Sequence, residues 1–170
     1  EMFKGATSFN QQLDKWDTRA AYDMSGMFED ATSFNPSTLD ANPRQVGSTK
    51  YLAWQTGSCG NFDRMFKNAS AFNGTIFRWD TTGVFSMKGM FSGSAFNKNI
   101  NTKETRRTWG DDGGMTWFSW NVANVMDMSY MFASCPYNKA MPDWNTSQVE
   151  DFTGMFRDNT AYNQPMLHEL

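Results

Sequence analysis

Met-Phe pairs recur along the chain, and apolar residues precede them at fixed spacings. From the second copy onward these residues stand at set distances before the Phe, as Val84, Met87 and Met90 do before Phe91. Positions i, i+3, i+6 and i+7 lie on one face of an α-helix. The pattern therefore predicts a helix of about two turns in each copy. The pairs are Met2-Phe3, Met27-Phe28, Met65-Phe66, Met90-Phe91, Met131-Phe132 and Met155-Phe156.

Two further positions extend the pattern into a repeat of about 25 residues. An aromatic-Asn pair follows every Met-Phe pair, and a Trp precedes all of them except the first. The segment around Trp-Asp-Thr is rich in aromatic and β-branched residues, which predicts a short strand. A unit this short cannot bury its own apolar face, so neighbours must stack and share one core. We therefore predict a repeat solenoid of six coils, each with one short strand and one short helix.

Two longer intervals interrupt the repeat, and we interpret them as insertions at about 37–50 and 99–116 that leave the solenoid at one edge. In this register Trp117 takes the core position three residues before Trp120. The whole chain, residues 1–170, is expected to form one solenoid domain. It opens and closes inside a repeat without the atypical capping repeats that solenoids carry. We therefore expect a segment of a longer chain, or ends that contact other chains.

The composition changes the picture of the core. The chain has 15 Phe, 13 Met and 7 Trp, whereas branched aliphatic residues are scarce, so rings and thioethers must fill the interior. The net charge of −3 offers no basic excess for a nucleic acid partner. No apolar run is long enough to insert into a membrane.

One polar residue recurs within the apolar pattern, and we expect it to form an Asn ladder between coils. Its side-chain amide would satisfy backbone groups of its own and the neighbouring coil. The ladder positions are Asn10, Asn35, Asn73, Asn97, Asn138 and Asn163.

The segments 2–18 and 24–35 resemble the repeat of the BspA-type leucine-rich-repeat surface proteins, a family often described only as a domain of unknown function. The motifs that carry the resemblance are Met-Phe, Phe-Asn and Trp-Asp-Thr. The resemblance implies a leucine-rich-repeat-like solenoid from a secreted or surface-anchored protein, in some cases linked to adhesion. It brings no catalytic residues, and the insertions and the scarcity of Leu depart from the family pattern.

Chemistry for catalysis is missing from the sequence. The only His is His168, close to the end of the chain, so no Ser-His-Asp arrangement is indicated. Cys59 and Cys135 occupy small apolar positions of the repeat and are predicted to be buried free thiols. Asp111 and Asp112 supply far fewer oxygen ligands than Ca²⁺ requires. We therefore expect no enzyme activity, no metal site and no cofactor.

The remaining candidates are surface sites. Of the sequons, Asn68 is the first candidate for glycosylation and Asn145 the second, whereas Asn73 is expected to be inaccessible as a ladder residue. The second insertion mixes charges with Trp109, the one Trp without a place in the repeat, as protein contact surfaces do. The alternative interpretation of this insertion is a solvated loop without a partner that folds back on its own coil. The candidate binding residues are Lys103, Arg106, Arg107, Trp109, Asp111 and Asp112.

These features favour a non-catalytic extracellular structural or adhesive module. Its partners would be other protein chains, including copies of itself end to end or laterally. The alternative function is a carbohydrate- or receptor-binding surface domain that uses the same insertion edge.

Overall fold

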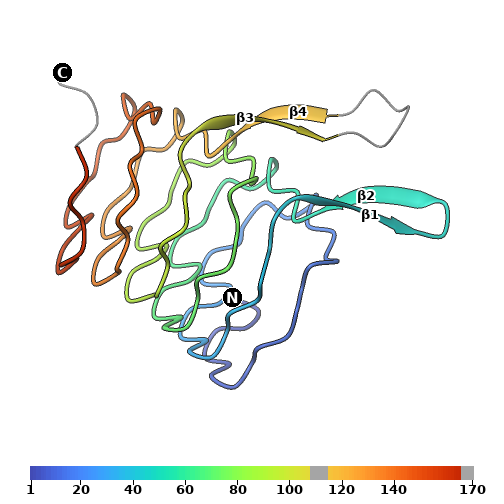
Figure 1. Cartoon of the computed structure of the whole chain (residues 1–170), viewed down its shortest axis with the longest axis horizontal. Helices are drawn as coiled ribbons and strands as arrows, with labels where there is room; N and C mark the ends of the chain where they lie inside the picture. The colour runs from blue at the N-terminus through green and yellow to red at the C-terminus, as the bar shows by residue number, and fades with distance from the viewer. Residues whose placement is uncertain (108–114, 166–170) are drawn as a thin grey trace.

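The fold was analysed in a computed structural model, which describes residues 1–107 and 115–165. Four strands occur in these residues: β1 (Asn42–Val46), β2 (Thr49–Ala53), β3 (Lys103–Arg107) and β4 (Met115–Ser119). β1 pairs antiparallel with β2, and β3 pairs antiparallel with β4, so the strands form two separate hairpins (Figure 1). Gly47, with φ +58°, supplies the positive φ that the two-residue turn between β1 and β2 requires.

Outside the hairpins the chain runs through successive turns, and corresponding residues of consecutive repeats lie side by side. The backbone N–H of Phe28 donates to the carbonyl of Met65 at 2.8 Å, one repeat further on. The same contact joins the other Met-Phe pairs: Phe3 to Met27, Phe66 to Met90, Phe91 to Met131, and Phe132 to Met155. We call a set of such corresponding positions a row.

The predicted helices are absent, and the backbone shows why. Gly26 and Asp30 have φ values of 57° and 61°, in the left-handed region that interrupts a right-handed helix. Between them, N–H groups alternate in direction. The N–H of Met27 turns back to the carbonyl of Met24, whereas that of Phe28 reaches the next repeat. Every second donor is therefore used between repeats and the others bond three residues back, so no continuous helical ladder forms.

The predicted fold class is wrong. The residues that the structure describes contain no helix, and their only strands belong to the two antiparallel hairpins. No leucine-rich-repeat-like solenoid with a strand and a helix in each coil is present there. The strand predicted around Trp-Asp-Thr is also missing. Apart from the hairpins, pairing is limited to isolated bridges, such as the parallel bridges of Asp127 to Ser86 and to Asp151.

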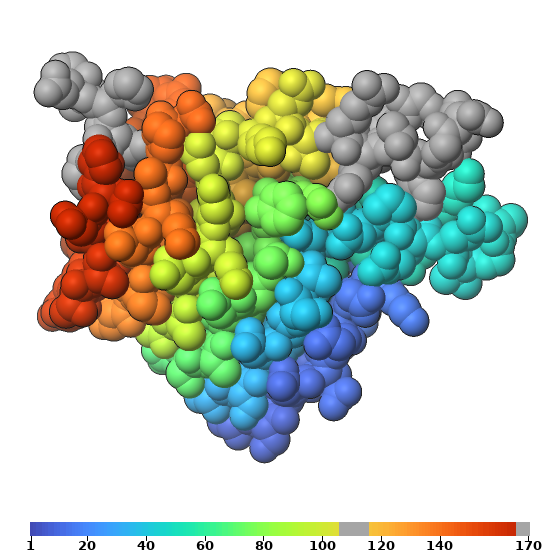
Figure 2. All heavy atoms as spheres, viewed as in Figure 1, coloured from blue at the N-terminus to red at the C-terminus, as the bar shows by residue number. Residues whose placement is uncertain are grey.

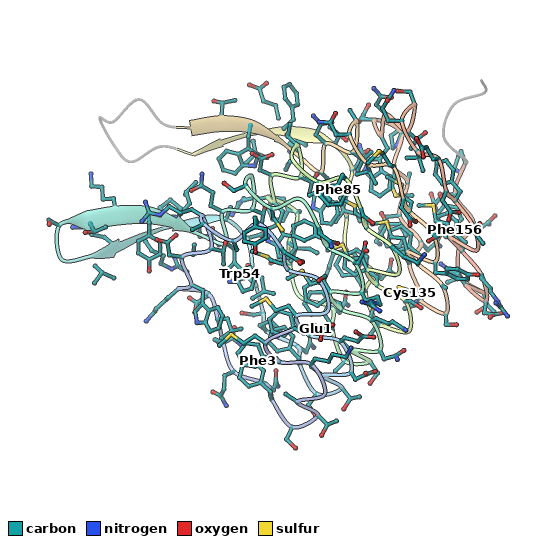
Figure 3. The ribbon with its side chains drawn as sticks, turned by 180° about the vertical axis from the view of Figure 1, so that it is seen from behind. Glu1, Phe3, Trp54, Phe85, Cys135 and Phe156 are labelled. Atoms are coloured by element: carbon teal, nitrogen blue, oxygen red, sulfur yellow. The ribbon has the colours of Figure 1, made fainter. Side chains whose placement is uncertain are left out.

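Rows of stacked aromatic rings fill the core. The tryptophan row stacks Trp16, Trp54, Trp79 and Trp120 with ring centroids 5.8–6.4 Å apart. A second row follows the Phe of each Met-Phe pair, from Phe3 to Phe156, which lie far apart in Figure 3. A third row stacks the aromatic residues of the first five aromatic-Asn pairs, from Phe9 to Tyr137. Rings of the second and third rows also stack within a repeat, as Phe28 and Phe34 do at 4.0 Å.

Leu39 and Ile100 show where the hairpins leave the repeats. Their carbonyls accept hydrogen bonds from the indole nitrogens of Trp79 and Trp144, in the same way that the carbonyl of Leu13 accepts from Trp54. Both residues are buried and fill the apolar row before Trp. Each hairpin is therefore inserted between this apolar residue and the Trp that follows.

Trp117 consequently does not occupy the core position predicted for it. It lies on β4, half-buried, with its indole nitrogen 2.9 Å from the carbonyl of Arg78. Trp54 and Trp120, which directly follow β2 and β4, have φ values of 51° and 52°. The left-handed backbone at these two residues returns the chain from each hairpin to the repeats.

Candidate functional site

The two hairpins project from the same side of the molecule and lie side by side (Figure 1). A cavity of about 100 Å³ lies between their bases, lined among others by Leu52 of β2 and by Thr116 and Trp117 of β4. Figure 2 shows the β1–β2 hairpin, in cyan, standing out from the rest of the surface. We call the surface formed by β1–β4 the hairpin edge.

Contacts with the neighbouring repeats hold each hairpin at its base. Arg44 on β1 donates from Nη2 to the carboxylate of Asp14 at 2.9 Å, and Tyr51 on β2 donates from its hydroxyl to the carbonyl of Lys15 at 2.8 Å. On the second hairpin, Ser119 forms an antiparallel bridge with Asp80. The hairpins are thus fixed to the neighbouring repeats by these contacts and not only through their chain ends.

Large apolar side chains stay exposed on this edge. Val46 at the end of β1 is 68% exposed, and Phe118 on β4 is 54% exposed. Each hairpin is also a two-stranded sheet, and among the described residues the bridge of Ser119 to Asp80 is the only pairing on the outer edges of the two hairpins. Unpaired edges and exposed apolar side chains are features that allow a sheet to pair with another chain.

The candidate residues of the second insertion divide into two groups. Lys103 opens β3 with an exposed side chain, and Arg106 and Arg107 lie on the same strand. Trp109, Asp111 and Asp112 lie outside the residues that the structure describes, as does His168.

The sequon residues differ in exposure. Asn68 is exposed with φ +56°, and its amide donates to the carboxylate of Asp30 at 2.9 Å. Asn145 is exposed and caps the backbone N–H of Ser147 at 3.1 Å. Asn73 is half-buried, so the expectation that it is inaccessible was too strict.

The predicted ladder residues form a continuous chain of hydrogen bonds at the surface. The side-chain oxygen of Asn73 accepts from the backbone N–H of Asn97 at 3.0 Å. The same bond joins Asn10 to Asn35, Asn35 to Asn73, Asn97 to Asn138, and Asn138 to Asn163. These side chains are exposed or half-buried, and they satisfy backbone donors of the next repeat.

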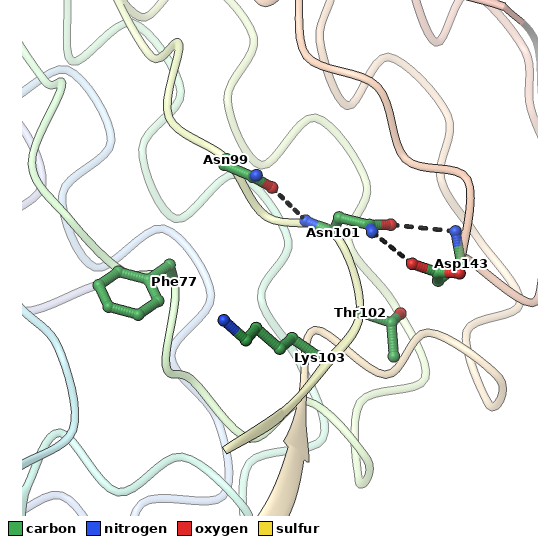
Figure 4. A pocket seen from close by; sticks show the side chains of 6 residues that line it. All are labelled: Phe77, Asn99, Asn101, Thr102, Lys103 and Asp143. Atoms are coloured by element: carbon green, nitrogen blue, oxygen red, sulfur yellow. Dashed lines mark hydrogen bonds between the residues drawn. The ribbon is translucent and has the colours of Figure 1, made fainter.

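A hollow of about 300 Å³ opens at the base of β3 (Figure 4). We call it the polar hollow. Asn101 is its best-anchored side chain: its Nδ2 donates to Asp143 at 2.7 Å, and its Oδ1 accepts from the Asp143 backbone N–H at 3.1 Å. Its own backbone N–H donates to Asn99 at 2.9 Å. The lining residues are Phe77, Asn99, Asn101, Thr102, Lys103 and Asp143.

The charges around the hollow nearly cancel. Lys103 has no ion-pair partner within the described ranges 1–107 and 115–165, and it extends toward Phe77 in Figure 4. The guanidinium of Arg78 lies over the Phe77 ring, with Cζ 4.5 Å from the ring centroid. Nearby, burial raises the pKa of Asp40, whose carboxylate accepts from the backbone N–H of Arg78.

Of the lining residues, only Lys103 was a candidate in the sequence. Phe77 could have been noticed, because it follows Ile76 where other repeats have Asp14 and Asn101. Phe77 is the one aromatic residue in a row that otherwise holds Asp14, Asp40, Asn101 and Pro142, and such a departure indicates a local function. Asp143 carries no such signal, because its place beside Asn101 depends on the stacking of repeats.

The described residues offer little support for metal or thiol chemistry. No group of three His, Cys, Asp or Glu side chains capable of holding a metal ion is found among them. Cys59 and Cys135 are free and buried, which confirms the prediction for both thiols. Burial raises the pKa of Cys59 to about 11, so its thiol stays protonated near neutral pH. No helix of the described part could span a membrane.

Comparison with known proteins identifies the repeat but no individual relative. A model of the family described as "Mycoplasma protein of unknown function, DUF285" matches residues 1–52, 48–110 and 114–168. This result confirms the resemblance at the level of the general group of BspA-like repeats. No curated protein and no solved structure matches the chain.

Proposed function

We propose a function for this chain from its membership of the DUF285 family of Mycoplasma-type repeats. It is a non-catalytic module that binds other protein chains through its hairpin edge. The module acts outside the cell or at its surface, in a structural or adhesive role. The observation that carries the proposal is the placement of two exposed hairpins side by side on a base of stacked rings.

The chemistry of the hairpin edge suits a protein partner. Val46 and Phe118 are large exposed apolar side chains, which gain free energy when a partner removes them from water. The open strand edges offer backbone donors and acceptors that a strand of the partner can use. The rigid ring rows reduce the conformational entropy lost on binding.

A charge substitution at the hairpin edge tests this function. We would measure self-association by sedimentation velocity, and adhesion of protein-coated beads to intact epithelial cells. The double variant Val46→Lys/Phe118→Lys should lose the association that the wild-type protein shows. The matched control Tyr22→Lys/Met126→Lys changes exposed apolar residues outside the hairpins and should keep it.

Two results would contradict the proposal. One is the absence of both self-association and adhesion in the wild-type protein. The other is an equal loss in the hairpin variant and in the control, because binding would then not depend on the hairpin edge.

A further inference from the structure

We propose that the polar hollow at the base of β3 is a saccharide-binding site. A single pyranose ring would stack its C–H face on Phe77 and place hydroxyls near Asn101, Lys103 and Asp143. This site goes beyond the proposed function, since it takes a small ligand and uses no apolar residue of the hairpin edge.

Phe77 provides the apolar part of the site. Its ring is 40% exposed although it belongs to a protein whose other rings are mostly stacked in the core. The Arg78 guanidinium lies over the ring and restrains it. A restrained, partly exposed ring is suited to contact with the C–H face of a sugar, which is apolar.

Asn101 and Asp143 provide a rigid polar part. Because two hydrogen bonds to Asp143 hold the Asn101 side chain and a third fixes its backbone N–H, the side chain is already oriented before a ligand arrives. Asn101 uses one amide hydrogen on the Oδ2 of Asp143, so the second amide hydrogen and the Oδ1 of Asp143 remain for a ligand. A neighbouring donor and acceptor match two adjacent hydroxyl groups, and the orientation costs little entropy on binding.

Lys103 completes the donor set. Its ammonium carries three donor hydrogens, has no ion-pair partner in the described part of the chain, and extends across the hollow toward Phe77. Asp143 offsets its charge, so the site as a whole is close to neutral. A neutral ligand rich in hydroxyl groups fits this balance better than a phosphate or a carboxylate does.

Other ligand classes fit less well. A Ca²⁺ ion needs six to eight oxygen ligands, whereas Asp143 is the only carboxylate among the described residues that line the hollow, and the Asn99 and Asn101 oxygens are already engaged. An apolar molecule would leave the polar lining unpaired. The volume of about 300 Å³ lies at the lower limit of ligand pockets and suits one sugar ring.

Ligand-observed saturation-transfer NMR on the whole chain tests the site directly. The probes are the methyl pyranosides of glucose, galactose, mannose and N-acetylglucosamine. At least one probe should show saturable transfer with a dissociation constant of about 1 mM, as a few hydrogen bonds and one ring contact would give. The transfer should be strongest at the ring C–H protons that face Phe77.

Variants separate the hollow from the rest of the surface. Phe77→Ala and Asp143→Asn should each weaken binding about tenfold or more. The control Phe118→Ala removes an exposed ring from β4 and should leave binding unchanged. Lys103→Ala removes a donor of the hollow and should also weaken binding. Because this side chain is exposed, folding is not at risk in this variant.

The outcome does not depend on the proposed protein contacts. The variant Val46→Lys/Phe118→Lys should still bind the saccharide even where it loses self-association. Absence of saturable transfer from all four probes would overturn the inference, and so would binding that Phe77→Ala and Asp143→Asn leave intact in folded protein.

Discussion

The indole nitrogen of Trp79 donates to the carbonyl oxygen of Leu39 at 2.7 Å, across a sequence separation that includes the whole β1–β2 hairpin. Three other Trp residues make the same bond to the apolar row of an earlier repeat: Trp54, Trp120 and Trp144. This bond keeps the repeats in register on both sides of each hairpin. The stacking of the repeats therefore stays the same at the points where the chain leaves for each hairpin and returns from it.

Trp79→Phe should therefore destabilise the protein by about 2–4 kcal/mol. The substitution leaves a void in the tryptophan row and a buried carbonyl at Leu39 without a donor. The free energy of urea unfolding measures the effect. Trp117→Phe is the matched control, and it should cost less because Trp117 is only half-buried and water can reach the carbonyl of Arg78. Equal losses in the two variants would contradict this explanation.

The ladder predicts a smaller effect. Asn73→Ala removes the acceptor of the Asn97 N–H and should destabilise by about 1–2 kcal/mol, since both residues are half-buried. Asn145→Ala removes an equivalent cap at an exposed site and should cost less than about 0.5 kcal/mol. Thermal unfolding monitored by near-UV circular dichroism would compare them. A neutral Asn73→Ala would mean that solvent replaces the ladder.

Spacing in the sequence placed the Met-Phe, aromatic-Asn and Trp residues into rows correctly but put Trp117 in the apolar row that Ile100 occupies, and it assigned the wrong backbone to the repeats. The 3-3-1 spacing of apolar residues fits a helix face as well as it fits alternating turns, so periodicity alone could not separate the two. The distinguishing signal was the Gly that precedes three Met-Phe pairs, namely Gly26, Gly89 and Gly154, which all have positive φ. Arg64 and Tyr130 have the same positive φ at this position although they are not Gly. The need for a left-handed residue before the Met-Phe pair is therefore not visible in every repeat.

The candidate site was only partly accessible to sequence reasoning for a similar reason. Lys103 could be selected because it lies in an insertion with unusual charge. The polar hollow instead combines Phe77, Asn101 and Asp143 from three repeats, and no local motif connects them. These residues come together because Leu39 and Ile100, rather than residues of the insertions, occupy the apolar row. The indole hydrogen bonds of the folded protein determine this assignment.

Gly89→Ala tests the alternating backbone. At φ +58° an added Cβ meets only the Arg64 side chain at 3.6 Å, so the cost comes from the left-handed conformation and should be about 1 kcal/mol. In a helix, the same change would stabilise the protein by a similar amount. The sign of the change in urea midpoint therefore distinguishes turns from a helix. Gly47→Ala, at a hairpin turn with open space, gives the reference cost for the same φ.

Tyr137 offers a substitution that should increase stability. Its hydroxyl is buried and has no hydrogen-bond partner among residues 1–107 and 115–165, and burial raises the pKa of the phenol. Tyr137→Phe keeps the ring stacked against Phe96 and Phe132 and removes the unpaired group. The free energy of unfolding should rise by about 1 kcal/mol. Tyr162→Phe, on the half-buried ring of the last aromatic-Asn pair, should leave it nearly unchanged, and a loss of stability in Tyr137→Phe would refute the argument.

Cys59 links stability to alkaline pH. Burial disfavours its thiolate and raises the pKa from the ordinary thiol value of 9.0 to about 11 in the folded protein. The unfolded chain therefore releases the proton first as pH rises. The stabilising effect of the neutral thiol is complete below pH 9 and is lost progressively as pH increases toward 11.

Two measurements on Cys59 would check this linkage. Cys59→Ala, which has no titrating group at this position, should show a weaker decline in the free energy of unfolding across that pH range than the wild-type protein. Alkylation of Cys59 in the folded protein should also stay slow at pH 8, because the thiolate is the reactive form and is scarce there. Rapid alkylation without unfolding, or identical pH profiles in the two proteins, would show that the thiol is not held in the buried row that the structure assigns to it.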